Sequence, residues 1–164
     1  MKRHAGLIPF SHDHHDALII AQRLRQGHSK SPRSQWPAAP EAQRDCVLEF
    51  YRDHLRHHLA AEEEVLFPLA RRYLDDRADL VDELEQEHED LRSGLEQLEG
   101  IDPQQLQPRL KAWAKLLHDH IRKEERRLFQ AMQEQVPEKE LMACKGRVEA
   151  FYAESGRGQD PCLL

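Results

Sequence analysis

The chain has 164 residues and a mass of 19.2 kDa, enough for one domain with a substantial apolar core but small for two. Its formal net charge of -6 argues against a nucleic-acid groove, and its apolar runs fall short of the roughly 20 residues that a membrane span requires. We therefore expect a single domain over residues 1–164 that binds neither nucleic acid nor membranes. The N-terminus lacks the apolar stretch of a secretory signal, which predicts a cytoplasmic protein.

Helical patterns run through the whole chain, and no alternating strand pattern competes with them. Apolar residues recur at three- and four-residue spacing in the long segments, whereas prolines and serines between residues 28 and 40 indicate a loop. Residues 154–164 are expected to form a flexible tail. The predicted helices cover about residues 11–27, 41–73, 76–99, 103–135 and 138–153.

Prolines and capping residues set the expected ends of these helices. Ser11 caps the first helix after Pro9, and Asp102 caps the fourth, with Pro103 at its first helical position. Pro68 is expected to kink or end the second helix locally. Because the connections are mostly short, sequential helices should be neighbours. The sequence therefore predicts an all-α fold, an antiparallel up-down-up-down four-helix bundle with a short extra C-terminal helix.

Histidines and glutamates occupy positions that the apolar stripes of the long helices would otherwise fill. The second helix carries His58 and Glu62 in its stripe, and the fourth repeats the pair as His120 and Glu124. His88 lies between two leucines in the stripe of the third helix and should point into the bundle. Other glutamates are expected outside this set: Glu87 and Glu89 pointing away, and Glu63, Glu64 and Glu125 at the surface or just behind the ligands.

The first helix offers several candidate histidines in a short cluster. By helical phase His14 lies with Leu18 and Ala21 and faces the core better than His15 does. His12 lies on a flank of the same helix. The helical pattern therefore favours His14 and keeps its neighbours as alternatives.

A histidine and a glutamate four residues apart on a helix are rotated by only about 40° and can reach one ion from the same side. Alone, such a pair is most often solvated, and one histidine on an apolar stripe is most often a hydrogen-bonded core residue. Two buried carboxylates, however, need a positive partner, and no lysine or arginine shares their stripe at that level. The joint pattern on four helices therefore predicts a metal cation.

Four segments within residues 12–129 resemble, in this order, the hemerythrin-like, or HHE cation-binding, family: "DHHDAL", "HLAAEEEVLFP", "EHEDL" and "HIRKEERRLF". The resemblance implies an up-down-up-down bundle around a non-heme di-iron centre. It places the first-helix ligand at His15, whereas helical phase favours His14. The other implied ligands are His58, Glu62, His88, His120 and Glu124, with the two glutamates bridging two iron ions.

Two positions depart from the oxygen-carrying hemerythrins. The oxygen-carrying hemerythrins have a second histidine four residues after the third-helix histidine. In this sequence, Arg92 stands at that position, four residues after His88. Glu124 follows His120 by four residues, where they carry an aspartate at five. Both departures look more like the broad bacterial HHE group, which is linked to oxygen or nitric oxide sensing, iron handling and iron-sulfur cluster repair. The set is one histidine short, and a second first-helix histidine, His54 or solvent would complete it.

The leading hypothesis is a soluble di-iron protein whose open coordination position takes a small diatomic ligand, such as oxygen or nitric oxide, or peroxide. One alternative is an enzyme, either a redox enzyme or an iron donor in iron-sulfur cluster repair or iron homeostasis. A further alternative is a structural or zinc-filled site that ties the helices together. We expect a metal-binding protein rather than an enzyme. The physiological ligand, the protein partner and the oligomeric state stay open.

Overall fold

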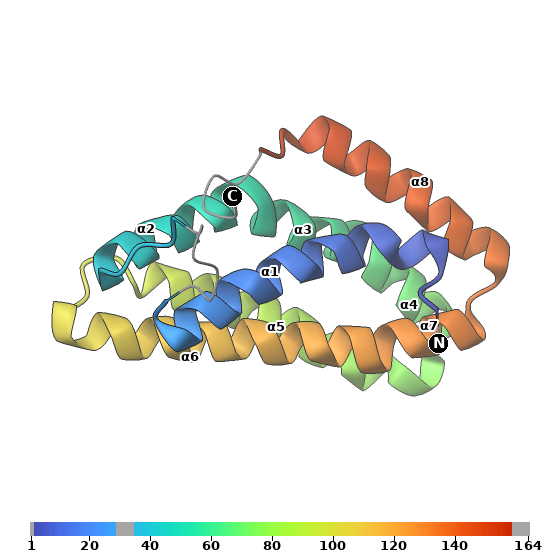
Figure 1. The fold of residues 1–164 in the computed structure, drawn as a ribbon. Helices are drawn as coiled ribbons and strands as arrows, with labels where there is room; N and C mark the ends of the chain where they lie inside the picture. The colour runs from blue at the N-terminus through green and yellow to red at the C-terminus, as the bar shows by residue number, and fades with distance from the viewer. Residues whose placement is uncertain (1, 29–34, 159–164) are drawn as a thin grey trace.

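The computed structural model describes residues 2–28 and 35–158, and within them it contains helices and no strand (Figure 1). This confirms the predicted all-α class. Four long helical segments and one further helix are present in these residues. They are η1 (Ala5–Leu7) with α1 (Ile8–Gln26); α2 (Pro40–Phe50), η2 (Tyr51–Leu55), α3 (Arg56–Ala61), η3 (Glu62–Leu66) and α4 (Phe67–Tyr73); η4 (Asp75–Arg77) with α5 (Ala78–Glu96); α6 (Pro103–Lys123), η5 (Glu124–Leu128) and α7 (Phe129–Gln135); and α8 (Glu138–Ser155).

The helix ends agree with the predicted capping residues, except that the first helix begins before Pro9. Asp102 caps α6 as predicted, because its Oδ1 accepts a hydrogen bond of 2.8 Å from the backbone N–H of Gln104. Pro9 does not stop the first helix but lies in its first turn, where no helical N–H is required. Gly27 ends α1 with a φ of +72°, which glycine adopts at low cost.

Residues 154–158 of the expected flexible tail have a defined place in the structure. Helix α8 continues to Ser155, and the backbone N–H of Gly158 donates a hydrogen bond of 3.0 Å to the carbonyl of Asp53. Residues 159–164 of the expected tail, and residues 29–34 of the expected loop, lie outside the described residues. The last described residues are therefore attached to the second long helix.

Three π-helical turns widen the long helices: η2, η3 and η5. Pro68 follows η3 in the first turn of α4, so the second long helix continues past a proline that was expected to kink or end it. Turn η3 begins at Glu62 and turn η5 begins at Glu124. Such turns occur most often at functional sites, where they redirect side chains. The two inward glutamates thus occupy equivalent positions in two different helices.

A polar layer divides the core of the bundle into two apolar clusters. One cluster includes Phe10, Phe67 and Phe129, and the other includes Leu91 and Trp113. Along each long helix the buried residues change from one cluster to the other at the inward histidines and glutamates. Rings of the first cluster lie directly against this layer, at centroid distances of 6.0 Å for Phe10 to His58, 5.2 Å for Phe67 to His88 and 5.4 Å for Phe129 to His14.

Contacts between neighbouring long helices join residues in reversed chain order. Asp13, early in α1, contacts His58 in α3, whereas Gly27, just after α1, accepts a hydrogen bond from Gln43 in α2. Helix α8 then turns back and packs against η1, α1, α3 and η3 (Figure 1). In the described part of the chain, no helix combines the length and apolar character that crossing a membrane would need.

Candidate metal centre

The polar layer brings six potential ligand side chains together. Among the described residues they form two groups that share Glu62 and Glu124: one with His14 and His58, the other with His88 and His120. In each group the donor atoms lie within 4.8 Å of one another. All six side chains are deeply buried, and the residues are at most 4% exposed. Two overlapping sets of four donors are the arrangement expected around two adjacent ions.

The distances between donor atoms suit a shared ion. The Nε2 atom of His58 lies 3.1 Å from Oε1 of Glu62, and the Nε2 atom of His88 lies 3.3 Å from Oε2 of the same carboxylate. Glu62 therefore directs one oxygen to each half of the cluster. The Nε2 atoms of His88 and His120 are 3.2 Å apart. Donors bound to one ion at about 2.1 Å lie about 3 to 4 Å from each other, so these nitrogens converge as two ligands would.

Glu124 takes the corresponding place on the fourth long helix. Its Oε2 lies 3.1 Å from Nε2 of His14 and 3.3 Å from Nε2 of His120. Yet no oxygen of Glu62 or Glu124, nor Nε2 of His14, makes a hydrogen bond of acceptable geometry with any described residue. A buried carboxylate left in this way costs free energy. These atoms fit a positive ion, and their nitrogen and oxygen chemistry suits iron.

The outward nitrogen of each histidine faces a carboxylate. The Nδ1 atoms lie 2.7 Å from Glu125 for His14, 3.2 Å from Asp13 for His58, 2.7 Å from Glu63 for His88, and 2.9 Å from Glu87 for His120. A carboxylate at Nδ1 holds the proton there and leaves Nε2 free to bind a metal ion. All the inward histidines of the cluster are therefore oriented as ligands.

Each of these carboxylates is in turn paired with a cation. The pairs are Glu125 with Arg3, Asp13 with Arg157, Glu63 with Arg92, and Glu87 with Lys123. The Arg92 and Glu63 atoms are 2.7 Å apart. Arg92 occupies the position at which the sequence analysis noted a histidine in the oxygen-carrying hemerythrins. Here it pairs with Glu63, the carboxylate that contacts His88. Outward from the centre, each histidine is thus followed by a carboxylate and then by an arginine or lysine.

A repeated local pattern produces this arrangement. On the second and fourth long helices, the first glutamate of each Glu-Glu pair turns inward, and the second reaches a histidine of a neighbouring helix. On the first and third, an acidic residue directly precedes the inward histidine: Asp13 before His14 and Glu87 before His88. Each of these acids supports a histidine of the following long helix.

The electrostatics of the cluster without metal follow from the same contacts. Burial lowers the pKa of His88, but the adjacent Glu62 carboxylate and the hydrogen-bonded Glu63 carboxylate outweigh it and raise that pKa to about 9. Burial also lowers the pKa values of His14 and His58. The neighbouring carboxylates outweigh this effect, so both pKa values are raised. Burial raises the pKa of Glu62, but His58 and the other rings lower it well below its usual range. Protons on the histidines thus offset the carboxylates, and a metal ion would replace them.

The structure distinguishes between the histidines of the first helix. His14 lies in the cluster, as helical phase indicated, whereas His15 and His12 are exposed. The cluster therefore contains the histidine that helical phase favoured, whereas His15, which the family resemblance implied, lies outside it. His54 does not join either ligand group; its ring stacks on Phe50 at a centroid distance of 5.8 Å.

Some residues around the site were not identified from the sequence. Glu87 was expected to point away but contacts His120. Asp13, Tyr152 and Arg157 were not singled out at all, although an acidic residue directly before an inward histidine is a detectable signal for Asp13. Tyr152 and Arg157 contact Asp13 from the segment around the end of α8, and no local sequence pattern predicts this contact.

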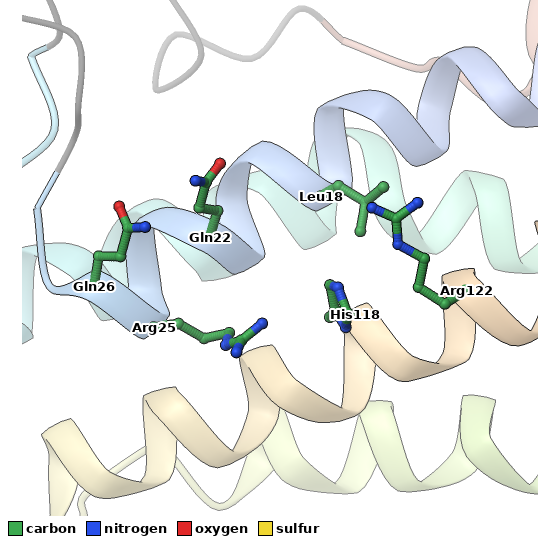
Figure 2. Close-up of a pocket in the computed structure, with 6 residues that line it drawn as sticks. All are labelled: Leu18, Gln22, Arg25, Gln26, His118 and Arg122. Atoms are coloured by element: carbon green, nitrogen blue, oxygen red, sulfur yellow. The ribbon is translucent and has the colours of Figure 1, made fainter.

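Two hollows near the bundle differ in their relation to the cluster. A groove of about 450 Å³ between α1 and α6 is lined by Leu18, Gln22, Arg25, Gln26, His118 and Arg122, and none of the ligand residues lines it. Figure 2 shows Arg25 of α1 reaching toward α6, with His118 and Arg122 of α6 reaching toward α1. A much smaller hollow of about 10 Å³, room for one water-sized molecule, is lined by His58, His54, Phe50, Leu55, Asp13, Asp16 and Arg157.

Comparisons with known proteins agree with this geometry. The chain is 30% identical over 122 residues to a protein of Nostoc sp. strain PCC 7120 described as a DNA nickase. That match covers 73% of this chain and 31% of the other protein, so the chain spans about a third of its relative. No solved structure matches the chain. The family model of the hemerythrin HHE cation-binding domain matches residues 8–132, which include all six potential ligands. The cluster fits a metal-cation site, and the chain belongs to the hemerythrin HHE cation-binding domain family.

Proposed function

We propose that the chain binds two non-heme iron ions in this cluster, one held by His14 and His58 and the other by His88 and His120. Glu62 and Glu124 would bridge them. The observation that carries the proposal is the orientation of the histidines, each with Nδ1 against a carboxylate and Nε2 turned toward two carboxylates that lack hydrogen-bond partners among the described residues. The reversed order of the contacts supports an antiparallel up-down-up-down bundle around the site.

The donor types, imidazole nitrogens and shared carboxylate oxygens with no cysteine in either group, favour iron over a structural zinc site. Each ion would receive two imidazole nitrogens and oxygens from two shared carboxylates. Structural zinc is usually complete with four ligands, often including cysteine, whereas iron commonly takes more ligands than this set supplies. Iron held by these residues would bind a small ligand such as oxygen or nitric oxide, or would react with peroxide in a redox step.

The other functions receive less support from the site. An iron donor must release its metal, whereas each ligand histidine here is held by a carboxylate that is itself paired with a cation. DNA nicking is the described activity of a protein about three times as long, and a phosphodiester could not reach ligand residues that are at most 4% exposed. The proposal is therefore metal-dependent binding or sensing of a small ligand, by a protein that is not primarily an enzyme.

Anaerobic purification followed by iron counting tests the proposal. We expect about two irons per chain in the wild type, and less than a quarter of that amount in the Glu62→Ala/Glu124→Ala variant. Spectra recorded after adding oxygen, nitric oxide and azide in turn should each show a distinct change. Less than one iron per chain, with the same amount in the variant, would end the proposal. A loaded protein with no near-ultraviolet or visible bands would point to zinc.

A further inference from the structure

The cations behind the histidines come from two different parts of the chain. For His88 and His120 they are Arg92 of α5 and Lys123 of α6, both within the long helices. For His14 and His58 they are Arg3 and Arg157, which lie before α1 and after α8. These last two also lie outside the residues 8–132 that the family shares. One half of the cluster is thus supported by residues that lie before α1 and after α8.

The C-terminal contact closes tightly around Asp13. The guanidinium of Arg157 donates two hydrogen bonds to this carboxylate, of 2.9 Å to Oδ2 and 2.5 Å to Oδ1. The hydroxyl of Tyr152 donates a third, of 2.7 Å to Oδ2, and the guanidinium lies over the Tyr152 ring at 4.7 Å. A bidentate arginine fixes the plane of a carboxylate as well as its charge. Asp13 is therefore held in place against His58 from outside the bundle.

The N-terminal contact repeats this design on Glu125. Arg3 pairs with the Glu125 carboxylate and also donates a hydrogen bond of 3.2 Å to the backbone carbonyl of the same residue. Its guanidinium lies 4.8 Å from the centre of the Phe129 ring, which in turn stacks on His14. Oε1 of Glu125 also accepts a hydrogen bond of 2.7 Å from the hydroxyl of Ser11. The support behind His14 thus includes residues before and within α1.

We propose that Arg3 and Arg157 are positioning residues for one of the two ions, so that the His14/His58 position depends on packing of the segments that carry them, before α1 and after α8, and the His88/His120 position does not. This inference rests on the proposed two-ion site. Its physical basis is that outer partners fix the ring orientation of metal-ligating histidines, and their loss typically weakens metal binding about 10- to 100-fold. Loss of Arg157 removes two of the three hydrogen bonds that hold Asp13 against His58, while Glu63 and Glu87 keep their own cations.

Single-position variants separate the two halves. The His120→Ala chain retains the His14/His58 position, and the His58→Ala chain retains the other. In anaerobic titrations with ferrous iron, Arg157→Ala should weaken the ion of the His120→Ala chain about 10- to 100-fold and change that of the His58→Ala chain by less than twofold. Arg92→Ala, the matched control, should show the reverse. Arg157→Lys, which keeps the charge but not the fork, should restore part of the affinity.

A second titration in the full chain keeps the inference testable if a single-position chain holds iron poorly. Arg157→Ala should leave one of two ions at wild-type affinity, and Arg157→Ala/Arg92→Ala should weaken both. Equal losses from Arg157→Ala in both single-position chains, or a double variant that still weakens only one ion, would overturn the inference. A wild type that binds two ions with no response to Arg157→Ala would overturn it too, and would leave the proposed function standing. A wild type that binds no iron would overturn both.

Discussion

The His14/His58 half and the His88/His120 half of the cluster present the same donor atoms, but their outer partners are joined over very different distances in the sequence. Arg92 and Lys123 lie 29 and 36 residues from the glutamates they pair with. Arg3 lies 122 residues from Glu125, and Arg157 lies 144 residues from Asp13. The outer partners of one half therefore lie within the long helices, whereas those of the other half come from segments before α1 and after α8.

Neutralising the bridging carboxylates should have the largest effect, because both halves share them. Glu62→Gln/Glu124→Gln keeps the size of both side chains but removes their charges, so both ions should be lost. In the wild type, iron at 100 times its dissociation constant should raise the free energy of unfolding by about 2.7 kcal/mol per ion. Urea unfolding with and without iron measures this gain, and the variant should show none. An iron-dependent gain that survives in the variant would place the metal elsewhere.

Cys144 reports whether the C-terminal helix is attached. It lies fully buried on α8, and burial raises the pKa of its thiol to about 11. A raised pKa leaves less reactive thiolate at any lower pH, about 100-fold less than for a thiol near its ordinary value. In a chain carrying Cys46→Ser and Cys162→Ser, thiol labelling at pH 8 should be about 100-fold slower in the folded protein than in urea. The rate should keep rising toward pH 11. Equal rates in both conditions would show that α8 is not packed as described.

Gly6 is the close contact between the N-terminal turn and α8. A Cβ atom at this position would collide with the backbone carbonyl of Leu141. Gly6→Ala should therefore lower the free energy of unfolding by about 1 to 3 kcal/mol and accelerate labelling of Cys144. Gly146→Ala, on α8 itself, is the control, because a Cβ atom at that position meets no atom within 4 Å. It should stabilise by about 0.5 to 1 kcal/mol. Equal effects of the two substitutions would contradict the contact.

Arg71 should show the smallest effect. It pairs with Asp82 and Glu85 at 2.7 Å, at a partly exposed position that contacts none of the ligand histidines. Exposed ion pairs contribute about 0 to 1 kcal/mol. Arg71→Ala should therefore change the free energy of unfolding by less than about 1 kcal/mol and leave the iron count unchanged. An iron loss like that of Arg157→Ala would mean that any arginine on this surface matters, and the comparison of the two halves would fail.

The fold and most of the ligand residues could be predicted because both depend on local spacing. The three- and four-residue period gave the long helices, and the same period placed His58, Glu62, His120 and Glu124 on their inner faces. Helical phase also favoured His14, which lies in the cluster, whereas the family resemblance indicated its exposed neighbour His15. Spacing on one helix is a property of that helix alone, so it needs no knowledge of the partner.

The supports behind the ligands could not be predicted in the same way. Glu87 was expected to point away because its position lies off the apolar stripe, yet a long side chain on the flank of α5 reaches His120 of α6. Arg3, Tyr152 and Arg157 act across the whole length of the chain. The π-helical turns that begin at the two inward glutamates depend on how the neighbouring helices pack, and no residue type marks them.

An anaerobic titration of the metal-free chain with ferrous iron, read by equilibrium dialysis, tests the central claim most directly. The paired groups that share Glu62 and Glu124 predict saturation at two irons per chain. Saturation at one iron would contradict the two-ion cluster, and failure to bind any would contradict the metal centre as a whole.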